Sequence, residues 1–130
     1  RLAALNRTDA DLAQLEAILA DAQRDIADRI STARLDVDFH AGVAAASKNR
    51  VLILAREPVN LLFRASIGQL QIALPVAASR NLDAHRKMLD AIRSGDAAEA
   101  ELWARRHLRD FHRGFELARI DLDGIVPKPD

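Results

Sequence analysis

The sequence predicts an all-α fold, and three observations carry that prediction. Apolar residues recur at the spacing of a helical face along most of the chain. Residues typical of helix starts and helix ends stand between these stretches, and no stretch has the pattern of a convincing strand. At 130 residues the chain is long enough for one domain with a core and too short for two, so we expect a single domain over residues 1–130.

The first part of the chain predicts two helices. Thr8 and Asp11 resemble a capping box, and apolar residues continue behind them at helical spacing, so we expect a helix from about residue 9 into the twenties. A second helix over 35–46 contains the run DVDFH. The opening residues 1–5 look like the end of an apolar helix, from which we expect that the chain begins inside a longer protein.

Asparagine and proline residues set the predicted helix boundaries in the middle of the chain. Asn49 is a good N-cap for the apolar segment 51–55. Pro58 permits a kink or a new helix start, because proline is tolerated in the first turn of a helix and costly in its interior. The next helix is therefore expected over 59–74, where Pro75 stops it.

A glycine and an aspartate divide the last part of the chain into two predicted helices. A helix over 79–93 is followed by Gly95, which favours a helix end, and by Asp96, which favours the start of the next helix. That final helix is expected over 97–117 or beyond. The remaining IVPKPD is a tail with two prolines and no periodicity.

Composition excludes several classes of protein. Lys plus Arg and Asp plus Glu number 19 each, so the chain has no net charge to attract DNA or anionic lipid. The chain is 49% apolar, yet no stretch approaches the roughly 20 apolar residues of a membrane span, and we expect a soluble protein without membrane contact. The lack of cysteine excludes disulfides and thiolate ligands and fits a cytoplasmic location.

A carboxylate and an imidazole lie one helical turn apart in the run DVDFH. On an ideal helix, Asp36 and His40 differ by about 40° around the axis and by about 6 Å along it, so both can point the same way. Asp38 points nearly opposite to His40. The pair could bind a metal together, although an ordinary Asp and His pair on a helix surface is also common at this spacing.

Two further histidines are predicted to face the core. His85 and His107 have apolar neighbours at helical spacing, whereas the neighbours of His112 at that spacing are charged, so His112 is assigned to solvent. A single core histidine is usually a hydrogen-bonded structural residue. Two core histidines and an Asp/His pair in one small core would all need partners for their buried polar atoms. One shared cation would serve Asp36, His40 and both core histidines together.

Four sequence fragments, in this order, resemble the FCD domain, the C-terminal effector-binding domain of FadR-subfamily GntR transcriptional regulators: DVDFH, the following SKN, DAHRKMLDAIRSGDAAEAE and ARRHL. The resemblance covers nearly the whole chain, from AALNRTDADLAQLEAIL onward. It implies an antiparallel bundle of about six to seven helices in which an Asp-x-x-x-His pair and two later histidines bind a divalent metal. Asp36 and His40 match the pair and His85 and His107 match the later histidines, so all four metal positions are filled.

The resemblance also implies a metabolite sensor. A small carboxylic acid or sugar acid would enter the bundle and approach the metal, and the change would reach an N-terminal winged helix-turn-helix domain that this chain does not contain. The ligand set leaves the metal open among zinc, nickel, cobalt, iron and manganese, with zinc or nickel favoured. We expect a homodimer in the cytoplasm that binds DNA only through the missing domain, and an effector domain whose first helix is truncated.

The effector-binding residues and two alternative functions complete the predictions. Arg64 could pair with an effector carboxylate through its planar fork, with Asn60 one turn earlier on the same face, although a surface arginine is the simpler interpretation. A metal-dependent hydrolase is one alternative, because an Asp/His metal site can activate water, but no HExxH, nucleophile motif or Gly-rich phosphate loop supports it. A metal-free helical interaction module is the other.

Overall fold

Six α-helices account for most of the residues that the structure describes. A computed structural model describes residues 1–120, with the side chains of all of these except Leu61, Leu62 and Ala65. The helices are α1 (Leu2–Asn6), α2 (Asp9–Ala27), α3 (Ala33–Ala46), α4 (Arg50–Ala73), α5 (Val76–Ser94) and α6 (Ala97–Ala118). No strand occurs within residues 1–120, so the predicted all-α fold is confirmed. The tail predicted at 125–130 lies outside the described residues.

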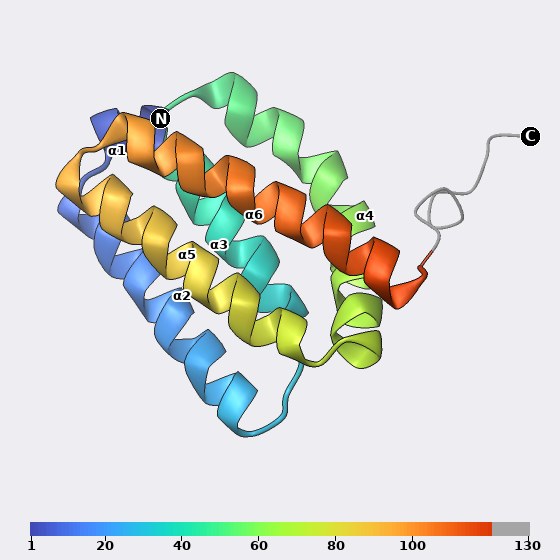
Figure 1. Ribbon diagram of the computed structural model, residues 1–130. Helices are drawn as coiled ribbons and strands as arrows, with labels where there is room; N and C mark the ends of the chain where they lie inside the picture. Colours follow the sequence, from blue (N-terminus) through green and yellow to red (C-terminus); the bar gives the residue numbers. More distant parts are fainter. Residues whose placement is uncertain (121–130) are drawn as a thin grey trace, which may run out of the picture.

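The long helices pack side by side, and each runs antiparallel to the one before it (Figure 1). Helix α2 packs against α3 and α5, α3 also packs against α4, and α5 packs against α6. Helix α1 lies at one end of the bundle, where it contacts α3, α5 and α6. The chain therefore forms the antiparallel helical bundle that the sequence resemblance implied. A search of the helices within residues 1–120 for one able to span a bilayer found none.

Most of the predicted helix boundaries are confirmed by the hydrogen bonds of their caps. Thr8 and Asp11 form the predicted capping box at the start of α2, each side chain accepting a bond from the other residue's backbone N–H. Asn49 and Asp96 each accept bonds from two backbone N–H groups in the first turns of α4 and α6. Gly95, between α5 and α6, has a φ of 78°, in the left-handed region that glycine enters without steric cost.

The helix boundary predicted at Pro58 is wrong, because α4 continues through this residue without a break. Side-chain hydrogen bonds hold α4 in place on both sides of Pro58. One is made to α3, and the others are made to the residue that precedes α3. Before the proline, the Arg56 guanidinium donates to the backbone carbonyl of Val37. After it, the Gln71 side chain bonds to the backbone N–H and the hydroxyl of Thr32, the residue preceding α3. These contacts offset the backbone hydrogen bond that an internal proline removes.

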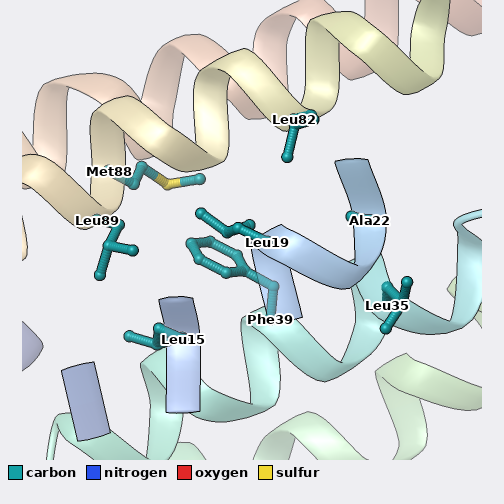
Figure 2. Close-up of a cluster of buried hydrophobic side chains, with 8 residues drawn as sticks. All are labelled: Leu15, Leu19, Ala22, Leu35, Phe39, Leu82, Met88 and Leu89. Carbon is teal, nitrogen blue, oxygen red and sulfur yellow. The ribbon is translucent and has the colours of Figure 1, made fainter. Parts of the chain in front are cut away.

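The main hydrophobic core lies between α2, α3 and α5 (Figure 2). Its members are Leu15, Leu19, Ala22, Leu35, Phe39, Leu82, Met88 and Leu89. Phe39 is fully buried, and a Cβ atom added to Gly42 one turn later would lie 2.7 Å from Cδ2 of Leu15, so α2 and α3 approach closely there. This packing fixes α3 relative to α5, and with them the side chains that these helices carry into the bundle interior.

Candidate metal centre and adjoining cavity

The four side chains that the sequence predicted as metal ligands converge in the interior of the bundle. Asp36 and His40 come from α3, His85 from α5 and His107 from α6. Each offers one ligand atom, and these atoms all lie within 4.8 Å of one another. Nε2 of His40 lies 3.2 Å from Nε2 of His107, and Nε2 of His85 lies 3.6 Å from Oδ1 of Asp36. Three helices thus bring together a set of residues that spans more than half of the chain.

Burial controls the charge of this cluster. The exposed fractions of Asp36, His85 and His107 are only 8%, 3% and 5%. Burial raises the pKa of Asp36 from 3.8 to about 7, and it lowers the pKa of His40 from 6.5 to about 3 and that of His107 to about 4. Burial also lowers the pKa of His85 well below its ordinary value. The imidazoles are therefore neutral near pH 7, which is the form in which a ring nitrogen can bind a cation.

Two buried neighbours hold the cluster in place. The Phe39 ring stacks on the His85 ring, with centroids 4.2 Å apart and 17° between the planes. The amide of Asn81, on α5, donates a hydrogen bond of 3.3 Å to Oδ1 of Asp36, and this bond lowers the pKa of that carboxyl against the effect of burial. Sequence reasoning missed Asn81. The available signal was a polar residue one turn before His85 on the apolar stripe of α5.

The residues present fit a divalent transition metal. Three neutral imidazole nitrogens and one carboxylate oxygen form a donor set that such ions accept. Within the described part of the chain, Nε2 of His85 is buried and has no hydrogen-bond partner. A buried polar atom without a partner is unfavourable, and a cation at this position would relieve it.

The two residues that helical geometry excluded from the cluster lie on the surface. Asp38 forms an ion pair with Arg34 at 2.7 Å on α3. The side chain of His112 is 64% exposed and lies 3.5 Å from Glu116 on the same helix. The buried positions of His85 and His107 and the exposed position of His112 confirm the orientations that the sequence predicted.

A cavity of about 790 Å³ adjoins the cluster and is lined by residues of α1, α3, α4 and α6. Asp36, His40 and His107 belong to its lining, and we call this part the floor. Asn60 also lines the cavity, whereas Arg64 is exposed and is not among the lining residues. Four residues along a helix add a rotation of about 40°, which carries Arg64 from the edge of the cavity face of α4 into solvent.

Arg56 is the cavity residue that sequence reasoning missed. It lines the cavity one turn before Asn60, and its guanidinium donates to the backbone carbonyl of Val37. Burial lowers the pKa of Arg56, and nearby carboxylates oppose that shift. A signal was present in the sequence, because apolar residues lie four positions before, three after and seven after this arginine. That pattern places a cationic side chain in the middle of an apolar helix face.

Fold and site together define an all-α domain with a buried, titratable cluster beside a cavity that opens to solvent. The family model of the FCD domain matches residues 1–110, and the chain belongs to this family. FCD domains are ligand-sensing domains of GntR-type transcription regulators and not enzymes, which at the level of the family disfavours the hydrolase alternative. A search of curated proteins gave no match to the chain.

Proposed function

We propose that this chain is the effector-binding domain of a FadR-subfamily GntR regulator and that it senses a small organic acid beside a divalent metal. The metal would be held by Asp36, His40, His85 and His107. The observation that carries the proposal is the convergence of these four ligand atoms, within 4.8 Å of one another, beside a cavity of about 790 Å³ whose floor three of the four residues form. Domains of this family often bind metals, which supports the same assignment.

Zinc or nickel is the metal that we propose, although cobalt, iron and manganese also accept three imidazole nitrogens and one carboxylate oxygen. When bound, the ion would supply positive charge and a coordination position for an oxygen of the effector. The chain's own residues would exclude water from the three buried ligands and keep the imidazoles neutral. Arg56 would bind the effector carboxylate, since a guanidinium can donate two parallel hydrogen bonds to it.

The cavity also suggests how occupancy could reach a DNA-binding domain. Arg1, Leu2 and Ala3 of the first helical segment line the cavity together with α3, α4 and α6. A ligand in the cavity would therefore contact the segment to which an N-terminal winged helix-turn-helix domain would be joined. We further propose that the regulator is a cytoplasmic homodimer that binds DNA through that N-terminal domain only.

The proposal is tested by measuring metal content and ligand binding on the same protein. The chain is purified without a chelator or a metal-binding tag, and its metal content is determined by elemental analysis. We expect about one zinc or nickel ion per chain, its loss in His85→Ala, and its retention in the exposed control His112→Ala. A screen of carboxylic acids by thermal shift then follows. Absence of metal, with melting unchanged on adding zinc or nickel, would refute the metal site, and absence of any acid response would refute sensing.

A further inference from the structure

We infer that a surface groove between α5 and α6 is a second ligand site, which binds a small molecule through a diphosphate or longer polyphosphate group. A nucleotide and free pyrophosphate both offer this chemistry. The inference goes beyond the proposed function, because the groove needs neither the metal nor the effector cavity. We call this site the basic groove.

The basic groove lies between two helices that pack against each other along their length (Figure 1). Its volume is about 600 Å³, within the usual range of small-molecule sites, roughly 300–1,000 Å³. It extends from Arg80 to Lys87 on α5 and from Trp103 to Arg113 on α6, so it is about 15 Å long. The groove and the effector cavity share only His107 among their lining residues, and no residue of α1 lines the groove.

Positive charge dominates the groove, whose lining contains five cationic side chains and two carboxylates. Arg80 donates to both oxygens of Asp110, and Asp83 lies 3.7 Å from Arg86. The other four cations are exposed, and none of them forms an ion pair with a carboxylate of the described residues. These four are Lys87, Arg106, Arg109 and Arg113.

Two acidic side chains of α6 that could neutralise these cations are engaged elsewhere. Glu99 accepts a hydrogen bond of 2.7 Å from the indole N–H of Trp103. Glu101 lines the effector cavity and not the groove, and it binds Arg1 and Arg105 at 3.0 and 2.8 Å. The uncompensated cations of α6 thus gather on the side of the helix that faces the groove.

Trp103 orients one of these cations. The guanidinium of Arg106 lies over the indole ring, 5.1 Å from its centroid. A guanidinium that stacks on a ring keeps the N–H groups at its edge free to donate. Arg106 therefore loses less conformational freedom when it binds an anion, and its planar fork matches two oxygens of a phosphate.

The spacing of the cations suits more than one phosphate. Arg106 and Arg113 are seven residues apart on α6, which separates them by about 10 Å along the axis. Lys87 reaches the groove from the opposite helix. A single phosphate would contact only part of this set, whereas two or three linked phosphates could contact cations at both positions. A polyphosphate group is therefore the anion that the groove fits best.

The surroundings of the groove favour a small anion over a nucleic acid. Asp83 lies at the edge of the groove, and Asp90 and Glu16 line the neighbouring depression between α2 and α5. The exposed fractions of these three side chains are 75%, 65% and 53%. A duplex lying across the groove would bring its phosphates close to these carboxylates, which would repel them. A small polyphosphate can bind the cations without reaching Asp90 or Glu16.

Trp103 provides a direct measurement, because it lines the groove and is the only tryptophan of the chain. The chain as purified is titrated at low ionic strength with pyrophosphate and with ADP, followed by the fluorescence of Trp103 and by isothermal titration calorimetry. We expect a saturable change in emission with each. Both should bind at least about tenfold more tightly than inorganic phosphate or tricarballylate, which carries three carboxylates and no phosphate.

Three variants locate the ligand. Arg106→Gln and Lys87→Gln should each weaken pyrophosphate binding about fivefold, as the loss of one exposed charge pair allows. Arg50→Gln is the matched control, since Arg50 is exposed on α4 and lines neither the groove nor the effector cavity. It removes the same charge and should change the affinity less than about twofold. Removal of a metal ion by pyrophosphate would not depend on Arg106, so these variants also separate groove binding from chelation.

The other outcomes would overturn the inference. Absence of a saturable change in Trp103 emission with both pyrophosphate and ADP would do so, as would an affinity for tricarballylate equal to that for pyrophosphate. An equal loss of affinity in Arg50→Gln would show that only the overall charge matters. Tighter binding of a DNA duplex than of ADP would assign the groove to nucleic acid instead. A difference between ADP and pyrophosphate supports the inference and tells the two sources apart. All of these outcomes leave the proposed function standing, because metal content and acid binding are measured separately.

Discussion

The floor of the cavity and the face of α4 that lines it, which we call the α4 wall, are built in opposite ways. The floor residues Asp36 and His107 are at most 8% exposed, and the adjoining His85 ring packs against the core residue Phe39. The α4 wall presents apolar side chains such as Leu52 and Val59, which are almost half exposed. Helix α4 packs more against α3 than against α5 or α6. The core thus determines the geometry of the floor, while packing constrains the side chains of the α4 wall less.

This difference suggests a division of roles within the proposed sensor. A preorganised cluster suits a metal and a carboxylate, because ligand atoms that are already in place lose little conformational freedom on binding. A face with few buried apolar contacts contributes less to the stability of the fold. Substitutions in the two regions should therefore affect different properties, stability and metal affinity on one side and ligand selectivity on the other.

The largest expected effect on the free energy of unfolding comes from removing one phenylalanine ring beside the floor and another on the α4 wall. Phe39→Ala should lower the free energy of unfolding by about 3–5 kcal/mol, because Phe39 is fully buried and the cavity left behind cannot be refilled. Phe63→Ala should cost less than about 1 kcal/mol, because Phe63 is 37% exposed. Urea unfolding of the metal-free variants measures both values. Equal losses would show that α4 is as tightly packed as the core and would remove the contrast.

The pH dependence of stability gives the next effect, in the metal-free chain. Because burial lowers the pKa of His107 from 6.5 to about 4, the unfolded chain takes up this proton first, and stability is lost as the pH falls from 6.5 toward 4. Burial raises the pKa of Asp36 from 3.8 to about 7, so the contribution of Asp36 to stability changes with pH in the direction opposite to that of His107. That contribution is fully present below pH 3.8 and is lost as the pH rises through about 7.

The variant Asp36→Asn separates the contribution of Asp36 to the pH dependence of stability from that of the histidines. The variant lacks the carboxyl that opposes the histidines, so its stability should fall more steeply than that of the original chain between pH 7 and pH 4. The difference should approach roughly 3 kcal/mol over this range, at 1.36 kcal/mol per pKa unit. Urea unfolding at a series of pH values, with a chelator present, measures it. Parallel curves for the two proteins would mean that Asp36 does not take up a proton in the folded state.

A smaller effect is expected from the neighbour that orients Asp36. Asn81→Ala removes the hydrogen bond to Oδ1 of Asp36 and should weaken zinc binding about tenfold, as is typical when a group that supports a metal ligand is lost. Competition with a chromophoric chelator measures the affinity. Ser79→Ala, an exposed position on the same helix, is the control. Unchanged affinity in Asn81→Ala would show that packing alone positions the carboxylate.

The sequence could predict the floor better than the α4 wall for a physical reason. The apolar stripes of α5 and α6 determine which way His85 and His107 point, so periodicity alone placed both in the interior. Arg56 and Arg64 both lie on a helix with apolar residues on several sides. Helical spacing places Arg56 on an apolar face, but only the packing of α4 on α3 makes that face line the cavity. Tertiary contacts also let Pro58 lie inside α4, which local rules for proline disfavour.

The last comparison uses two glycines to measure backbone crowding beside the core and on α4. Gly42→Ala should destabilise by about 1–3 kcal/mol, because its Cβ would lie 2.7 Å from Cδ2 of Leu15, a fully buried side chain with little room to move. Gly68→Ala should stabilise by about 0.5–1 kcal/mol, because nothing lies within 4 Å of its Cβ and alanine favours a helix over glycine. Urea unfolding of both variants measures whether each substitution lowers or raises the free energy of unfolding. Destabilisation by Gly68→Ala would contradict the open space beside this residue.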